Sequence, residues 1–412
     1  MRREFHRYPE LAFTEFRTAS RIVEILQSLH YDVIFSSDAM DASKRLRTPT
    51  DQELDTARER AIADGANPEI ISNMKDGLTA VVGILKGSEP GPTIAFRFDM
   101  DAVKVEESRD INHIPIIENF VSKYTGIMHA CGHDAHIAIG LDLASRMTKC
   151  QFAGTLKLIF EPAEEGGTGG ARSIVGKGIL DDVDQIYCLH VSSGAELGTV
   201  VTGVKYLATT KLEAEFFGTP AHSASAPEKG RNALLGAASA LLNIHAIPAY
   251  GKDEVRVNVG ILQGGTAVNI VPDYAKMSIE TRATSENTNK EVLERVKRII
   301  SGSAEMQQLK SVIKIIGEAT TTNCDPEAME IVMEAAKELN FSTVIRSKNA
   351  NSSEDAGYLI QQVQNHGGKG TYIAVGSGKF HAHHNNLFDI EEAVLPKAVG
   401  LLKKIACKVL TS

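Results

Sequence analysis

Three histidines and one cysteine lie within eight consecutive positions in the first half of the chain. These positions are His129, Cys131, His133 and His136, with Asp134 among them. Thiolate and imidazole groups bind zinc, manganese and similar ions, and a glycine between two ligands lets the backbone bend around one ion. The alternative is a polar loop before a helix, with Asp134 as its capping residue. The density of ligand-type side chains favours a metal site.

Two adjacent carboxylates, Glu164 and Glu165, follow an apolar run that ends shortly before them. In open α/β sheets, binding sites form at the carboxyl ends of the strands. One carboxylate there could bind a metal while the other handles protons, although an exposed acidic loop is the usual alternative. The next apolar run ends at His190, which would lie at the same edge of the sheet. This histidine favours the site over the exposed loop.

Two further segments carry ligand-type side chains after strand-like runs. His381, His383 and His384 follow one such run, and we expect at least one of them to bind metal. His381 and His383 are equally compatible with surface positions. Asp99 and Asp101 follow another run, where they could bind metal or accept a hydrogen bond from a ligand histidine.

The elements that must position these residues alternate between apolar runs and amphipathic stretches. The patterns predict strands at 78–85, 93–98, 155–160, 185–191 and 372–375, and helices at 16–29, 137–147 and 171–176. This alternation predicts an α/β domain with a mostly parallel sheet and helices on both faces. The polar segment 36–77, with a helix near 51–64, is expected to be an excursion from that core.

The middle of the chain follows a different pattern. Alternating apolar residues predict half-buried strands at 212–216, 255–261, 275–279 and 312–316, and helices at 232–247 and 290–300. This βαββαβ order predicts a small α+β, ferredoxin-like domain. We therefore expect an inserted domain at 204–318, within a catalytic domain formed by residues 1–203 and 319–412.

Bulk properties exclude several classes of protein. A length of 412 residues predicts two or three domains, and a formal net charge of −8 disfavours nucleic acid as the main partner. No apolar run approaches the roughly 18 residues of a membrane span, and the charged start lacks a signal peptide's apolar core. Five scattered cysteines fit a reducing cytosol. These properties predict a cytoplasmic protein with neither a membrane nor nucleic acid as its partner. A small-molecule substrate is an expectation from the candidate site.

Together these segments resemble the amidohydrolase branch of the aminoacylase/carboxypeptidase metallopeptidases, the group of auxin-amide and hippurate hydrolases. The matching pieces run nearly end to end, and begin at His6, Arg97, His129, Glu161, Ala221, Asn269, Ser353 and His384. The resemblance implies an enzyme with two divalent ions, Mn²⁺ or Zn²⁺. It implies that the metal ligands are Cys131, His133, Glu165, His190 and His384.

The resemblance also implies roles beyond the metal ligands. Glu164 would be the general base, and His222 of the inserted domain would reach the site of a partner chain and polarise the scissile carbonyl. Asn269 and Arg282 would bind substrate carboxylates. The inserted domain would act in dimerisation and as a lid, in a homodimer or in a heteromer with a related chain.

Within this branch, the segment 36–77 is similar to one found in hydrolases of p-aminobenzoyl-glutamate. The resemblance therefore implies cleavage of that amide to p-aminobenzoate and glutamate, with another N-acyl amino acid (hippurate-like or N-acetyl) as the alternative substrate.

Two hypotheses from other classes compete with a metal-dependent hydrolase. A thiol hydrolase would use Cys131 as nucleophile and His133 or His136 as base, which leaves Glu164 and His190 unexplained. A non-catalytic metal-binding interaction protein would have no need of Glu164 beside a ligand.

Overall fold

The structure is a computed structural model that describes every residue except 252, 379–380 and 411–412. The chain divides into two compact units. The large unit comprises Met1–Lys205, Thr322–Ala350 and Glu354–Ser412, and the inserted unit comprises Tyr206–Thr321 with Asn351–Ser353. Each unit has a hydrophobic core of its own.

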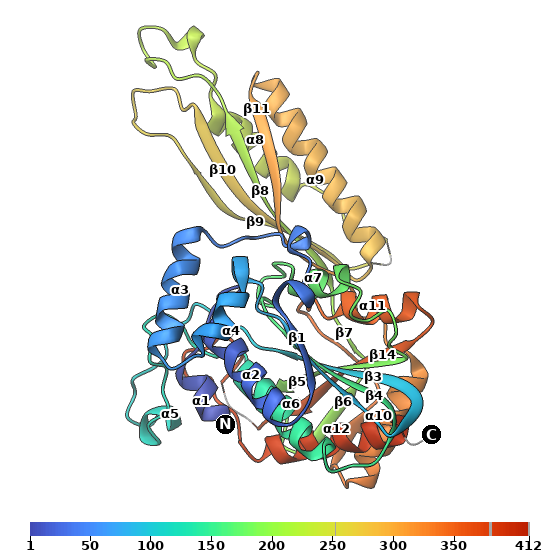
Figure 1. Cartoon of the computed structure of the whole chain (residues 1–412). Coiled ribbons are helices and arrows are strands. Elements are labelled where there is room, and N and C mark those ends of the chain that lie inside the picture. The colour runs from blue at the N-terminus through green and yellow to red at the C-terminus, as the bar shows by residue number, and fades with distance from the viewer. Residues whose placement is uncertain (252, 379–380, 411–412) are drawn as a thin grey trace. The chain divides into compact units, whose positions relative to one another are not determined.

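The large unit is built on a sheet of eight strands in the order β1-β2-β4-β3-β5-β14-β6-β12 (Figure 1). The four central strands β4, β3, β5 and β14 are parallel, whereas β1–β2, β2–β4 and β14–β6 are antiparallel. The predicted α/β fold with a largely parallel sheet is confirmed, and the antiparallel pairs were not predicted. The strands are β1 Asp32–Phe35, β2 Val81–Lys86, β3 Glu89–Asp99, β4 Ala153–Glu161, β5 Gln185–Ser192, β6 Thr199–Thr202, β12 Thr343–Ile345 and β14 Lys369–Gly376.

Helices cover the two faces of this sheet. On one face, α6 and α12 contact β3 and α2 contacts β2; on the other face, α7 contacts β4 and α11 contacts β5 and β14. Gly140 lets α6 approach the sheet closely, because a Cβ there would lie 2.8 Å from the rings of Phe98 and Phe160. The helices are α1 Arg2–Arg7, α2 Phe16–Ser28, α5 Ile114–Ile117, α6 His133–Met147, α7 Gly170–Gly176, α10 Pro326–Glu338, α11 Gly357–Asn365 and α12 Val394–Leu410. A short pair, β7 Val204–Lys205 and β13 Lys348–Asn349, lies outside the large sheet.

The segment 36–77 forms two helices, α3 Asp51–Ala63 and α4 Pro68–Asn73, that pack on α2. A capping box starts α3: the Thr50 hydroxyl accepts the Glu53 N–H, and the Glu53 carboxylate accepts the Thr50 N–H. Leu54 and Ile71 are buried in the core of the large unit. The expected helix is present, but the segment is part of the packed unit. The sequence did not predict this packing, because the segment is mostly polar and has few apolar residues.

The inserted unit has an antiparallel sheet in the order β11-β8-β10-β9 and two helices. Its elements follow one another along the chain as βαββαβ, in agreement with the predicted pattern. Leu212, Ala214 and Phe216 alternate into its core, against Val296 and Ile300 of α9. The elements are β8 Ala208–Phe217, α8 Ala233–His245, β9 Val255–Gly264, β10 Tyr274–Ala283, α9 Glu286–Met306 and β11 Lys310–Ala319.

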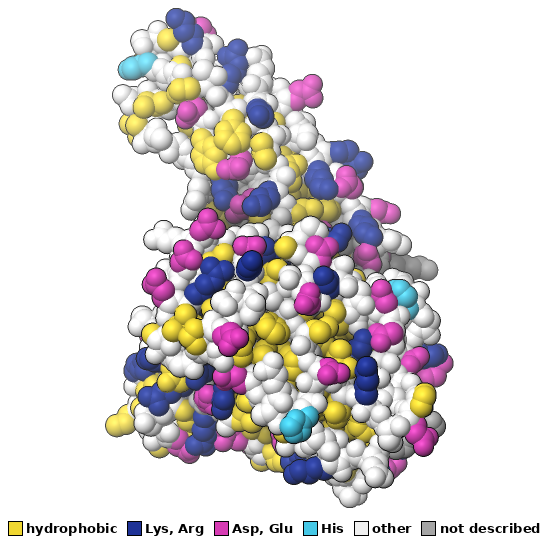
Figure 2. Space-filling model, in the orientation of Figure 1, with side chains coloured by type: hydrophobic (Ala, Val, Ile, Leu, Met, Phe, Trp, Pro, Cys, Tyr) yellow, Lys and Arg dark blue, Asp and Glu magenta, His cyan; other side chains and the backbone are white. Residues whose placement is uncertain are grey.

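Charges of both signs are mixed over the surface shown in Figure 2, and no single-sign patch dominates that face. Among the described residues, no helix combines the length and apolar character needed to cross a bilayer.

Candidate functional site

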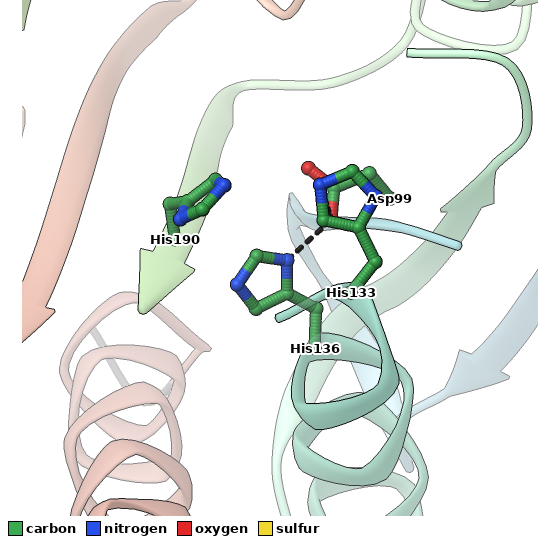
Figure 3. A group of neighbouring side chains, drawn as sticks. All are labelled: Asp99, His133, His136 and His190. Atoms are coloured by element: carbon green, nitrogen blue, oxygen red, sulfur yellow. Dashed lines mark hydrogen bonds and ion pairs between the residues drawn. The ribbon is translucent and has the colours of Figure 1, made fainter. Parts of the chain in front are cut away.

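The ligand-type side chains gather where the parallel strands of the large unit end. Asp99 at the end of β3 is opposite Glu161 at the end of β4, and β3 and β14 both pair in parallel with β5, which carries His190. The start of α6 brings His133 and His136 to the same edge (Figure 3). Segments far apart in the sequence therefore supply one site.

Gly132 shapes the turn between Cys131 and His133. Its φ is +90°, and it is the N-cap residue immediately before α6. A Cβ at this position would lie 2.6 Å from Cγ2 of Val191, closer than carbon atoms can approach. Only glycine therefore allows the two ligand-type residues to flank this turn beside β5.

The His133 ring is held with one nitrogen directed to the backbone. Its Nδ1 is 2.8 Å from the carbonyl oxygen of Asp101, so Nδ1 donates and Nε2 is the ring nitrogen left available to a metal. Nε2 is buried and makes no hydrogen bond to any residue that the structure describes. Although burial favours the neutral ring, Asp99 and Asp101 raise the pKa of His133 to about 10. The same negative surroundings would stabilise a metal cation in place of that proton.

His190 and Cys131 present two more donor atoms. His190 Nδ1 donates to the carbonyl of Val191 at 2.6 Å, and its Nε2 is 3.5 Å from Sγ of Cys131. Burial and the charges of Glu165 and Glu164 raise the pKa of the Cys131 thiol well above its ordinary value. A thiol held protonated in this way is a poor nucleophile, which disfavours the thiol-hydrolase hypothesis. A bound cation would displace the proton and hold the thiolate as a ligand.

The donor atoms form two groups that share His133. One group is Cys131, His133 and Glu165, and the other is Asp99, His133, His136 and His190; within each group the atoms lie within 4.8 Å of one another. Thiolate, imidazole and carboxylate donors at this spacing fit divalent ions such as zinc or manganese. The unpartnered Nε2 of His133 between them supports the same conclusion. The chain's residues therefore fit the metal centre that the sequence predicted.

His136 differs from its neighbours because both of its ring nitrogens are used. Its Nδ1 bonds to Asp99 (Figure 3), and its Nε2 accepts the N–H of Val191 at 2.8 Å. A nitrogen that accepts a hydrogen bond has no lone pair left for a metal. His136 therefore fixes Asp99 and β5 and is not available as a ligand. His129 is buried without a hydrogen-bond partner among the described residues, and burial lowers its pKa to about 3.

Glu164 and Glu165 leave β4 through a strained turn. Ala163 has a φ of +58°, unusual for a residue with a side chain, and its N–H donates to Glu15 at 2.9 Å. Asp101 then accepts the N–H groups of both glutamates, at 3.2 and 3.0 Å. Asp101 and Glu15 thus set the directions of the two carboxylates. No pattern in the sequence indicated the Glu15 contact, which joins positions 148 residues apart.

A buried arginine organises the acidic residues behind the site. The Arg97 guanidinium binds Asp99 and Glu161 at 2.5 Å each, Glu354 at 3.0 Å and Asp355 at 3.3 Å. The Glu164 carboxylate lies within 4.8 Å of Glu354 and Asp355. Burial and the charges of Glu354, Glu165 and Asp355 raise the pKa of Glu164 well above its ordinary value.

The histidine run after β14 places two rings near the donors. His384 Nε2 is 3.0 Å from Glu165 Oε1, and the left-handed backbone of His384 (φ +65°) donates its N–H to Ala130. His383 Nδ1 is 3.6 Å from Cys131 Sγ, and its Nε2 accepts the N–H of Ser193. His383 is thus half-buried beside Cys131, whereas His381 is exposed.

The inserted unit holds the three remaining candidates. His222 and Asn269 are neighbours, since His222 pairs with Ile270 and the Ser223 N–H donates to the Asn269 carbonyl. His222 Nδ1 accepts the N–H groups of Ala224 and Ser225, which leaves the proton on Nε2. Arg282 pairs with Thr209, near the opposite end of β8, and its guanidinium binds Glu280 at 2.9 Å. The structure therefore brings His222 and Asn269 together but not Arg282.

Groups that could hold a metal, with the separate carboxyl of Glu164 beside them, are what a metal-dependent hydrolytic site requires. Residues 95–408 match the model of Peptidase family M20/M25/M40. The chain belongs to this family, and it is a metal-dependent hydrolase of amide bonds.

The similar proteins cover almost the whole chain. It is 41% identical over 406 residues to an indole-3-acetyl-aspartic acid hydrolase of Enterobacter agglomerans, with 97% of this chain and 93% of the relative covered. It is 40% identical over 410 residues to one of the subunits of p-aminobenzoyl-glutamate hydrolase of Escherichia coli (strain K12), with 98% and 94% covered. A crystal structure of an aminobenzoyl-glutamate utilization protein from Klebsiella pneumoniae matches with a TM-score of 0.83 and 36% identity, covering 99% of this chain and 94% of that one.

Proposed function

We propose that this chain hydrolyses the amide bond between an aromatic acyl group and an acidic amino acid, with p-aminobenzoyl-glutamate as the first candidate substrate. The observation that carries the proposal is the position of two adjacent glutamates. Glu165 lies with Cys131 and His133, whereas Glu164 lies with the acidic residues Glu354 and Asp355. Two relatives at 40–41% identity are named for a glutamate and an aspartate conjugate. Indole-3-acetyl-aspartate is therefore the second candidate.

The proposed metal ligands are those with a donor atom facing the site. Cys131, His133, Glu165, His190 and His384 would hold two divalent ions, Mn²⁺ or Zn²⁺. Such ions, when bound, lower the pKa of water towards neutrality and polarise the carbonyl as Lewis acids. Asp99 and Asp101 would not bind the ions; Asp101 positions His133 and both glutamates, and Asp99 positions His136.

Glu164 would act as the general base. It would accept a proton from the attacking water and deliver it to the leaving nitrogen of the glutamate or aspartate product. Its raised pKa suits a carboxyl that must hold a proton between these two steps. The Nε2–H of His222, from a neighbouring copy of the chain, would donate a hydrogen bond to the oxygen that becomes negatively charged.

The assembly and the substrate contacts in the inserted unit extend this proposal. Asn269 would contact the substrate beside His222, and Arg282 stays a prediction of the family resemblance. The protein would be a homodimer, or a heteromer with a related chain, because the name of the Escherichia coli relative describes it as one subunit of a hydrolase. Its five free cysteines favour a reducing, cytoplasmic location.

The paired variants Glu164→Gln and Glu165→Gln test the division of labour. Glu164→Gln should keep its metal and lose at least about 10²–10⁴-fold in kcat on p-aminobenzoyl-glutamate, with KM little changed. Glu165→Gln should lose metal, and excess Mn²⁺ should partly restore its activity. Metal analysis and steady-state kinetics measure both effects. If Glu164→Gln loses metal and Glu165→Gln retains it, the two roles are reversed.

A substrate panel tests the reaction itself. Manganese-loaded protein should cleave p-aminobenzoyl-glutamate and indole-3-acetyl-aspartate faster than hippurate or N-acetyl amino acids, as followed by product chromatography. Chelation should abolish turnover. Full turnover in a protein shown to be metal-free would contradict the proposal.

A further inference from the structure

A cavity of about 480 Å³ opens in the large unit beside the metal donor Glu165. One wall is α3 and the loop before it, both within the 36–77 segment; the opposite wall includes Leu11, Val103 and Ile127. All of its lining residues belong to the large unit. The cavity is large enough to hold part of a small acyl amino acid, and of the residues in the mechanism above only Glu165 lines it.

Three basic residues, Arg47, Arg60 and Lys104, line this cavity in a chain whose net charge is −8. The acidic residues that share the lining are Glu53 and Glu165, and both have other partners. Glu53 caps α3 through Thr50, and Glu165 meets His384. Arg47 is 3.9 Å from Glu53, in a pair so exposed that it contributes little. For Lys104, the described residues provide no ion pair.

Arg60 is the most distinctive of the three basic residues. Its guanidinium lies over the ring of Tyr124, 4.4 Å from the centroid, which orients the group without using its N–H donors. Its Nε is buried and has no hydrogen-bond partner among the residues that the structure describes. The nearby carboxylate of Glu10 already accepts the N–H groups of Arg17 and Thr18. A buried donor without a partner is costly, and Arg60 lines the cavity, so a ligand that brings an acceptor group to this guanidinium would offset that cost.

We infer that this cavity binds the side-chain carboxylate of the substrate's acidic amino acid, with Arg60 as the main contact and Arg47 and Lys104 completing a positive field. This inference rests on the proposed function, and it specifies which part of the substrate the cavity recognises. A guanidinium binds a carboxylate through two parallel N–H bonds, and the apolar wall strengthens that interaction. The 36–77 segment is then a specificity element, since it supplies both arginines.

The test compares p-aminobenzoyl-glutamate with p-aminobenzoyl-glutamine, which differ only in the charge of the side chain. Wild-type protein should prefer the glutamate conjugate in kcat/KM. Arg60→Gln should reduce kcat/KM for the glutamate conjugate by about ten- to a hundredfold, mostly through KM, and should reduce that for the glutamine conjugate much less. Arg60→Lys should retain part of the preference. Arg58→Gln is the matched control, because Arg58 is on the same helix, pairs with Asp55 and does not line the cavity.

Each failure has a distinct signature. If the wild type cleaves neither of these conjugates nor indole-3-acetyl-aspartate, the proposed function fails. The inference about the cavity is overturned, while the function stands, if the wild type cleaves the glutamate conjugate without preferring it to the glutamine conjugate. It is also overturned if Arg60→Gln keeps the wild-type preference or lowers kcat/KM for both conjugates equally. A change in the discrimination between p-aminobenzoyl and acetyl conjugates, with the glutamate preference intact, would also overturn it, because the cavity would then hold the acyl group.

Discussion

At the scale of single residues, hydrogen bonds decide which histidines can bind a metal. His133 and His190 each donate Nδ1–H to a backbone carbonyl and keep Nε2 for the site. His136 is only three positions after His133, but its Nε2 accepts a hydrogen bond from the Val191 N–H. The sequence shows these histidines as equivalent residue types, and only the neighbouring strand distinguishes them.

Gly132→Ala should separate the donors on either side of it. The added Cβ would meet Val191 Cγ2 at 2.6 Å, so Cys131 and His133 must move away from β5 and its His190. We expect the variant to retain fewer ions after desalting and to unfold at a lower temperature. Metal analysis and thermal unfolding measure both effects.

Gly65→Ala is the matched control for that variant. Gly65 has nearly the same φ, +89°, but a Cβ there meets nothing within 4 Å. Gly65→Ala should therefore lower the free energy of unfolding by about 1 kcal/mol, the effect of the left-handed backbone alone, without loss of metal. Equal metal retention in the two variants would contradict a steric role for Gly132.

Residue types and their spacing were sufficient to predict the donor clusters, but not the groups that support them. Arg97 binds Glu354 and Asp355 across more than 250 positions, and Glu15 holds the Ala163 turn from another distant segment. Such contacts depend on how the elements fold together. The sequence left the position of His383 open for the same reason, since its contacts with Cys131 and Ser193 join distant segments.

At the scale of elements, local patterns predicted the strands and helices well, and pairing less well. The βαββαβ order and the central parallel strands follow from periodicity and alternation. The antiparallel pairing of β2 with β4 does not, because register between strands is a non-local property. The predicted start of α6 at residue 137 was late: the helix begins at His133, since Gly132 supplies the turn before it.

The docking of α1 on α6 should depend on pH through His6. His6 is fully buried between Asp134 of α6, at 2.8 Å, and Glu107, at 3.0 Å. Burial opposes the charged ring, but the hydrogen bonds to both carboxylates raise the pKa of His6 to about 9. Because the pKa of His6 is higher in the folded protein than in the unfolded chain, the protonated ring stabilises the fold. This stabilisation is complete below pH 6.5, the ordinary pKa of histidine, and it disappears as the pH rises through about 9.

His6→Gln should therefore destabilise the protein more at pH 6 than at pH 10. The difference should be on the order of 2–3 kcal/mol, given the size of the shift. Denaturant unfolding at the two pH values measures it. His366→Gln, at an exposed position, is the control and should show little difference between them. A loss for His6→Gln that does not change with pH would show that the ring acts by packing alone.

At the scale of the whole molecule, the inserted unit has surfaces suited to assembly. Its strand β9 is at the edge of the sheet, and edge strands can pair with a strand of another chain. Ile261 and Leu262 on this strand and Leu242 on α8 are exposed, and Figure 2 shows hydrophobic side chains gathered on this unit. Exposed apolar groups of this kind favour pairing with a second copy through the same unit.

A complementation experiment tests whether such a dimer shares its active sites. Glu164→Gln and His222→Ala should each be nearly inactive alone, and sedimentation should show both as dimers. In a mixed dimer, the chain with His222→Ala keeps Glu164 and receives an intact His222 from its partner, so one of two sites is complete. Random pairing should restore about a quarter of wild-type activity, because half of the dimers are mixed and each has one working site. Dimers that mix freely but regain no activity would show that His222 does not serve a neighbouring chain, and a fully active monomer would exclude the shared site altogether.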